Sequence, residues 1–200
     1  VNRQIGEILG LNTVDDGVAV GELYLNNMPI TNLAIPATAT KVRPFTFVNV
    51  SNLSGSLTMS DSVTSIGAHA FANCAGLTSV TLGNNIETIG YAAFSGCNGL
   101  AGNLNIPKAT TTIEAHAFEG CSSLDQILIE EGVTAVGDYA FAGCSAVQIL
   151  RYNAEISSDY TLDSNVFTNL GLNSNTSTCS VLIGDNVENI PAYLFFCTGT

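Results

Sequence analysis

Four of the six cysteines recur at the same place in four consecutive segments, and thiols are the side chains here with the richest possible chemistry. They are Cys74, Cys97, Cys121 and Cys144, spaced by 23 or 24 residues. Thiols can form disulfides or, as thiolates, bind zinc. In stacked strands, successive thiols would stand about 4.8 Å apart or more, whereas a disulfide needs Cβ atoms about 3.8 Å apart. A straight row also cannot surround one zinc ion tetrahedrally. We therefore expect a buried column of unpaired thiols.

The remaining candidate ligands are few. Cys179 and Cys197 lie outside the row, and a disulfide between them stays open. His69 and His116 are two segments apart, about 10 Å in a regular stack, which is too far to share one metal ion. The Asp-Asp-Gly sequence at 15–17 could bind calcium, but a turn is the favoured reading. The sequence thus predicts no metal site and no cofactor.

No arrangement typical of catalysis is found. There is no Gly-x-Ser-x-Gly turn that would expose a nucleophilic serine. There is also no glycine-rich loop with a lysine that would hold phosphates. We predict that the chain is not an enzyme and has no catalytic residues.

These side chains are positioned by a repeated phrase of the type Ile-Gly-x-x-Ala-Phe-x-x-Cys. Its phenylalanines are separated by steps of 24, 23, 24, 23, 26 and 28 residues, and they are Phe47, Phe71, Phe94, Phe118, Phe141, Phe167 and Phe195. Self-similarity at such a period indicates a repeat protein whose units stack on one another. Equivalent residues should then lie over one another, so the seven phenylalanines should form a buried column beside the four cysteines.

Each unit contains further apolar positions that indicate its elements. After the phenylalanine comes an alternating segment such as Leu77, Val80 and Leu82, which predicts a strand with a period of two. A turn, a second short extended piece and the Ala-Phe-x-x-Cys phrase follow, and the last of these predicts one or two helical turns. Two units carry an extra residue and a glycine, Gly55 or Gly102, which predicts a bulge just before the strand.

The pattern Leu77-x-x-Val80-x-Leu82-x-x-Asn85 resembles the leucine-rich repeat signature, and the Ala-Phe-x-x-Cys phrase resembles its BspA-like subclass. Four near-copies carry the resemblance, at 66–77, 89–100, 113–124 and 136–147. It implies an α/β-type repeat solenoid of about seven units of 23–28 residues, each with one parallel strand and a short helical turn, wound right-handed. Members are bacterial surface or secreted proteins, some implicated in adhesion to host matrix or to other cells. The resemblance implies no catalytic residues.

Two regions are expected along the chain. Residues 1–29 show no repeat and predict an N-terminal cap containing a β-hairpin, since the open end of a solenoid needs a cover. Residues 30–200 predict the solenoid, with an incomplete last unit.

Composition limits the partners. The net charge of −12 argues against binding nucleic acid or an anionic membrane surface, and no apolar run approaches the length of a membrane span. We expect an extracellular or cell-surface monomer that binds a protein, either a matrix component or another cell's surface. The alternative is a rigid spacer that presents other domains of a longer protein.

A binding surface is predicted where the strand residue between the last two apolar positions points outward. This outward row is Ala34, Thr58, Thr81, Asn105, Leu128, Arg151 and Leu182. Its later part mixes apolar residues with an arginine, as interface centres do. The predicted site therefore consists of Asn105, Leu128, Arg151, Leu182 and, from an inserted loop at 154–160, Glu155, Asp159 and Tyr160.

Overall fold

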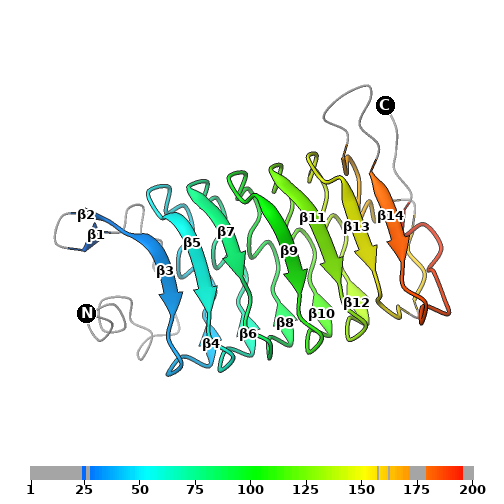
Figure 1. Ribbon diagram of the computed structural model, residues 1–200, viewed down its shortest axis with the longest axis horizontal. Helices are drawn as coiled ribbons and strands as arrows, with labels where there is room; N and C mark the ends of the chain where they lie inside the picture. The colour runs from blue at the N-terminus through cyan, green and yellow to red at the C-terminus, as the bar shows by residue number, and fades with distance from the viewer. Residues whose placement is uncertain (1–23, 26–27, 157, 162, 172–178, 196–200) are drawn as a thin grey trace.

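Strands alternate with turns along the whole described chain, and successive strands of each kind lie side by side (Figure 1). The computed structural model describes residues 24–25, 28–156, 158–161, 163–171 and 179–195. The chain runs down a front strand, crosses beneath, rises along the back and returns over the top to the next front strand. This path is the predicted right-handed solenoid (Figure 1).

The front of the coil consists of seven parallel strands in two sheets. The first sheet contains β3 (Thr31–Ile35), β5 (Ser54–Met59) and β7 (Leu77–Thr81). The second contains β9 (Gly102–Ile106), β11 (Leu124–Ile129), β13 (Ile149–Tyr152) and β14 (Ser180–Ile183). The predicted strands are thus confirmed, although no ladder pairing joins β7 to β9.

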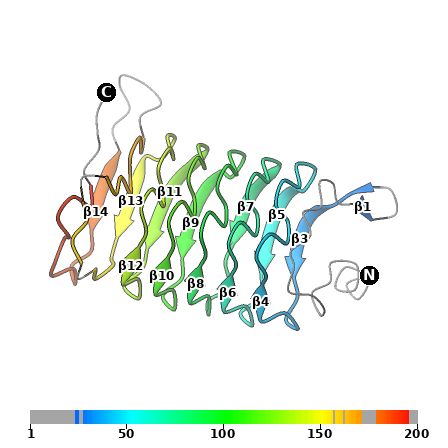
Figure 2. The same cartoon turned by 180° about the vertical axis from the view of Figure 1, so that it is seen from behind.

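The back of the coil is a sheet of five two-residue parallel strands, visible in Figure 2. These are the second extended pieces of the units: β4 (Lys41–Val42), β6 (Ser65–Ile66), β8 (Thr88–Ile89), β10 (Thr112–Ile113) and β12 (Ala135–Val136). Their second residues point inward and are buried, so front and back sheets enclose one continuous apolar core.

The phenylalanine column is confirmed, with six rings buried and Phe195 partly buried at its end. From Phe47 to Phe195 every ring stacks on the next, with centroids 5.0–5.5 Å apart. The first five pairs are within 10° of parallel. These separations fall in the range that aromatic pairs favour, so each ring contributes stacking as well as burial.

The predicted helical turn is wrong, since the described residues contain no helix. The Ala-Phe-x-x-Cys phrase is a run of turns in which alternate N–H groups bond to the next unit. The N–H groups of His69, Phe71 and Asn73 donate to carbonyls of Tyr91, Ala93 and Ser95 at 2.7–2.8 Å. His69 and Asn73 also have positive φ, of 54° and 60°. An α-helix needs right-handed φ at every residue, so the left-handed φ of His69 and Asn73 excludes a helix here, and the freed N–H groups bond between units instead.

Both predicted bulges are confirmed. Gly55 and Gly102 have φ of 79° and 72°, in the left-handed region that favours glycine. The strand register shifts between Gly55 and Ser56, and again opposite Gly102. The register change falls at the start of β5 and β9, inside these strands and not before them as predicted, and the inward side chains keep their places.

The hairpin expected near the N-terminus is present as β1 (Tyr24–Leu25) paired antiparallel with β2 (Met28–Pro29). Residues 1–23 lie outside the described part, and so does the Asp-Asp-Gly sequence at 15–17. The covering role of residues 1–29 therefore stays a prediction. The boundaries of the solenoid at 30–200 and its incomplete last unit also stay predictions, because 196–200 are not described.

Candidate binding surface

The four cysteines form the predicted buried column, and their thiols also form hydrogen bonds that were not predicted. All four side chains are fully buried, and each thiol donates to the phenylalanine carbonyl of the preceding unit. The Sγ–O distances are 3.0 Å for Cys74 and Cys97 and 3.3 Å for Cys121 and Cys144. A small side chain with a weak donor therefore fits this position.

These thiols are held in their neutral form. Burial raises the pKa of Cys74 and Cys144 to about 12, and it raises the pKa of Cys97 and Cys121 as well. A thiolate is the form that attacks disulfides or binds metal, so the column is chemically inert at neutral pH. The possible disulfide between Cys179 and Cys197 lies outside the described residues, because Cys197 is not among them.

The raised pKa values predict a loss of stability in alkali. A group whose pKa is higher in the folded state contributes full stability below its unfolded pKa, here near 9.0, and loses it as pH rises above that value. At pH 10 each buried thiol should cost about 1.4 kcal/mol. Guanidinium titrations at pH 8 and pH 10 should therefore show a smaller alkaline loss for Cys121→Ala than for the unmodified chain. Equal losses in the two proteins would contradict the burial of a neutral thiol at this position.

The two histidines do not converge. The ring of Tyr91 lies between them, with centroids 5.2 Å from His69 and 5.3 Å from His116. Within the described residues, no group of three His, Cys, Asp or Glu side chains is placed to hold a metal ion.

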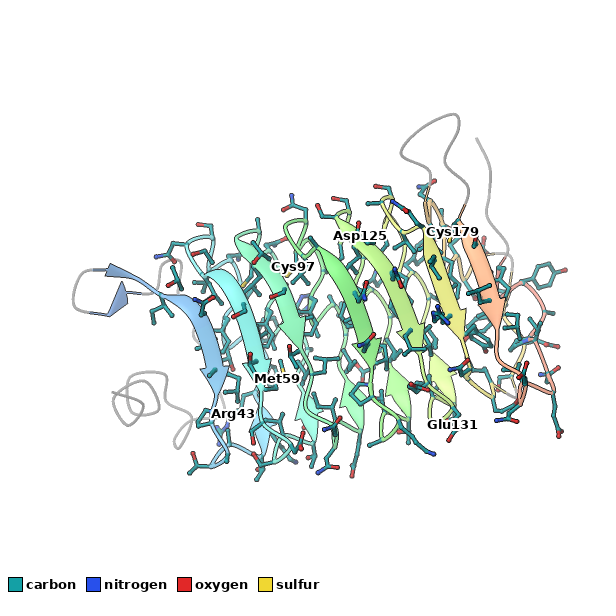
Figure 3. The ribbon with its side chains drawn as sticks, viewed as in Figure 1. Arg43, Met59, Cys97, Asp125, Glu131 and Cys179 are labelled. Carbon is teal, nitrogen blue, oxygen red and sulfur yellow. The ribbon has the colours of Figure 1, made fainter. Side chains whose placement is uncertain are left out.

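The outward row is aligned as predicted within each front sheet. Leu128 on β11 pairs with Arg151 on β13, and Arg151 pairs with Leu182 on β14. Asn105 on β9 pairs with Leu128 on its other side. Side chains project outward from these strands in Figure 3. Four of the seven predicted site residues thus share one line across four strands.

A shallow hollow of about 290 Å³ opens beside this line. Its lining residues are Leu128, Glu130, Arg151, Asn153, Leu182, Ile183 and Gly184. We call this set the front patch. Leu182 is 45% exposed, Leu128 is half-buried, and Arg151 is exposed and forms no ion pair within the described part of the chain. An arginine between two leucines can bury its stem against them while its guanidinium stays available.

The three loop residues of the predicted site do not join the front patch. Glu155 and Asp159 accept hydrogen bonds from the backbone N–H groups of Glu188 and Ala192, at 2.6 and 2.8 Å. Tyr160 donates its hydroxyl to the carbonyl of Val136 on the back sheet, at 2.9 Å. Burial raises the pKa of Tyr160 to about 12. All three therefore fasten neighbouring units together.

Sequence reasoning missed Glu130 and Asn153. Each lies two residues beyond a member of the outward row and so points the same way, and the Asn153 amide donates to Glu130 at 3.3 Å. Extending the period of two past the end of each strand would have found both.

The repeated phrase and the coiled fold can now be compared with known protein families. The model of the BspA type leucine rich repeat region matches residues 18–148 and 100–200, which together span most of the chain. The chain belongs to this family. The expectation drawn from its repeated phrase is confirmed, and this BspA-type chain can be compared with solved relatives. No curated protein matches it.

Three solved structures are similar to this chain. A leucine rich cell surface protein from Faecalibacterium prausnitzii is 32% identical over 68% of this chain and 35% of its own, with a TM-score of 0.56. The T. pallidum leucine-rich repeat protein is 24% identical, covers 90% of this chain and 75% of its own, and has a TM-score of 0.59. A leucine-rich repeat protein from Bacteroides ovatus is 24% identical over 74% of this chain and 47% of its own, with a TM-score of 0.55.

The last two likenesses concern the fold alone. This BspA-type chain spans about a third of the F. prausnitzii protein and about half of the B. ovatus protein. In the part of the chain that the structure describes, no helix is long and apolar enough to cross a membrane.

Proposed function

We propose that the chain is a non-catalytic module that recognises a protein through the front patch, on the outside of a cell or in the surrounding medium. The main support for this proposal is the alignment of Leu128, Arg151 and Leu182 beside one hollow. Leucine-rich repeats generally bind proteins, which supports this class of function. The F. prausnitzii relative is called a cell surface protein, which supports the location.

The chemistry of the front patch suits a protein partner. Interface centres are more apolar than the surrounding surface and are enriched in arginine, and a few residues carry most of the binding energy. A partner that covers the hollow would bury the exposed faces of Leu128 and Leu182 and place an acceptor opposite Arg151. We place such a partner among matrix proteins or on the surface of another cell, and we take the chain to act as a monomer. Nucleic acid remains an unsuitable partner for a chain of net charge −12.

A double variant tests the patch. Leu128→Ser combined with Arg151→Ala should lower affinity for an immobilised matrix protein or an intact cell surface by about tenfold or more, because two central residues are lost. Affinity is measured by surface plasmon resonance against a panel of purified matrix proteins. Binding to intact cells is measured as a second test. The matched control is Thr58→Ala with Thr81→Ala, which changes the same outward row on the first sheet.

Two outcomes would contradict the proposal. Equal binding by the double variant and the control would show that the front patch does not bind the partner. If neither the variants nor the unmodified chain bound any matrix protein or cell surface, the spacer function would be favoured. The spacer has support of its own, since the chain spans only part of its relatives.

A further inference from the structure

A second row of rings runs along the solenoid outside the core. It follows the back-sheet strands β4, β6, β8, β10 and β12 by two or three residues. We call it the edge ladder, and its members are Phe45, His69, Tyr91, His116 and Tyr139. Successive centroids are 5.0, 5.2, 5.3 and 5.2 Å apart. Phe45 and Tyr91 are 42% and 43% exposed, and the others are half-buried, so the ladder presents an aromatic strip to solvent.

The backbone gives no reason for rings at these positions. Each unit from Phe47 to Phe167 has two residues with left-handed φ, one two places before the core phenylalanine and one two places after it. The later position holds only the residue types that tolerate this conformation best, namely Asn49, Asn73, Gly96, Gly120, Gly143 and Asn169. The earlier position holds Phe45, His69, His116, Tyr139 and Tyr193, with φ of 54–60°, and in the other two units it holds Ala92 and Asn165. Bulky side chains are retained where the same chain could use glycine or asparagine, which points to a use for the rings themselves.

Tyr91 departs from the ladder in an informative way. In its unit Ala92 takes the left-handed position, with φ of 50°, and the ring comes from the residue before it. The Tyr91 ring is turned by 66° and 64° from the imidazoles of His69 and His116, whereas His116 and Tyr139 lie within 6° of parallel. The row of rings therefore continues through this unit, although the residue at its left-handed position, Ala92, has no ring.

Carboxylates gather at one end of the edge ladder. A Glu114 carboxylate oxygen accepts from the Tyr91 N–H at 2.7 Å, and a Glu119 oxygen lies 2.9 Å from Nδ1 of His116. Asp138 is exposed and immediately precedes Tyr139. Arg43 lies near the other end, two residues before Phe45. The section from Tyr91 to Tyr139 thus combines one exposed ring and two half-buried rings with three acidic side chains.

We propose that this acidic section of the edge ladder is a second docking surface, which takes an arginine- or lysine-rich segment of a protein. A guanidinium or ammonium group is attracted both by aromatic rings and by carboxylates, and the two attractions act together when both lie at one site. The net charge of −12 raises the local concentration of such a segment and repels nucleic acid. The surface lies on the turns that follow back-sheet strands β8, β10 and β12, and it is independent of the function proposed for the front patch.

The probe is a fluorescein-labelled peptide of alternating arginine and glycine, followed by fluorescence anisotropy. The test variant is His116→Asn with Tyr139→Asn. Asparagine already occupies the equivalent left-handed position at Asn165, where φ is 44°, so the backbone is accommodated. We expect the affinity to fall by about tenfold, as for loss of central aromatic contacts. Circular dichroism checks that the variant is folded.

A pair of charge variants separates the site from general attraction. Asp138→Asn and Asp125→Asn remove the same charge, but Asp125 lies on front strand β11 (Figure 3). Asp138→Asn should weaken binding several-fold, and Asp125→Asn should change it less than twofold, as screening at physiological salt predicts. The front-patch double variant should bind the peptide like the unmodified chain, so the two proposals fail separately.

Three results would overturn the proposal. One is unchanged binding by the ring variant, which would leave bulk charge as the cause. Another is an equal effect of Asp125→Asn and Asp138→Asn. The third is displacement of the peptide by a neutral oligosaccharide at lower concentration than by unlabelled peptide, which would make the edge ladder a carbohydrate surface.

Discussion

Replacing Ile127 by aspartate should unfold the middle of the solenoid. Ile127 is fully buried on β11 and points into the core between Leu104 and Leu150, its partners on the adjacent strands. A carboxylate at this point would have no hydrogen-bond partner and would lose its hydration, at a cost of about 4 kcal/mol or more. Guanidinium titration followed by circular dichroism at pH 7 measures the loss.

The neighbouring residue provides the matched control. Leu128 is half-buried and points outward in the front patch, so Leu128→Asp should change stability by about 0.5–1 kcal/mol at most. The pair differs only in which face of one strand receives the charge. Similar losses for both variants would mean that β11 does not alternate as described, and the outward row would then lose its basis.

Phe118→Ala should cost about 3–5 kcal/mol, the range measured when a buried phenylalanine is truncated. The Phe118 ring is fully buried and stacks at 5.2 Å on Phe94 and at 5.4 Å on Phe141. Its removal leaves a cavity and breaks two ring contacts at once. The same titration gives the magnitude, and urea at two protein concentrations excludes association as a cause.

Phe45→Ala is the control for this truncation. Phe45 is 42% exposed in the edge ladder, and alanine already occupies the equivalent position at Ala92. Its loss should be about 1 kcal/mol, the value of one aromatic contact. A loss at Phe45 as large as that at Phe118 would contradict the distinction between the core column and the edge ladder.

The sequence was sufficient for the parts of the fold that repeat. Phe71, Phe94 and Phe118 occupy identical places in nearly identical phrases, and units that stack must bring them together. The inward and outward faces of each strand also followed, since alternation is a local property of extended chain.

The helical turn was mispredicted because apolar spacing alone does not distinguish a helix from a turn that bonds to its neighbours. The Ala-Phe-x-x-Cys spacing suits one helical face, yet the N–H of Phe71 donates to Ala93 in the next unit. Only the stacked structure reveals that competing partner. The asparagines and glycines two places after the phenylalanines from Phe47 to Phe167 were the available signal, because both residues favour left-handed φ.

The candidate site was predictable only where it lies on strands. Leu128, Arg151 and Leu182 followed from the repeat, whereas Glu155, Asp159 and Tyr160 belong to an inserted loop that has no counterpart in other units. Their bonds to Glu188, Ala192 and Val136 depend on where that loop returns to the coil. The edge ladder was hidden for a related reason, since Tyr91 is one place out of phase with the other rings.

The most direct test is a nuclear Overhauser measurement between phenylalanine rings in chain labelled only at phenylalanine. Successive core rings, whose centroids are 5.0–5.4 Å apart, should give cross-peaks in one unbroken series from Phe47 through Phe71, Phe94 and Phe118 to Phe141. Ring contacts between units that are not neighbours in sequence, or the absence of contacts between neighbours, would contradict a single column and with it both proposed surfaces.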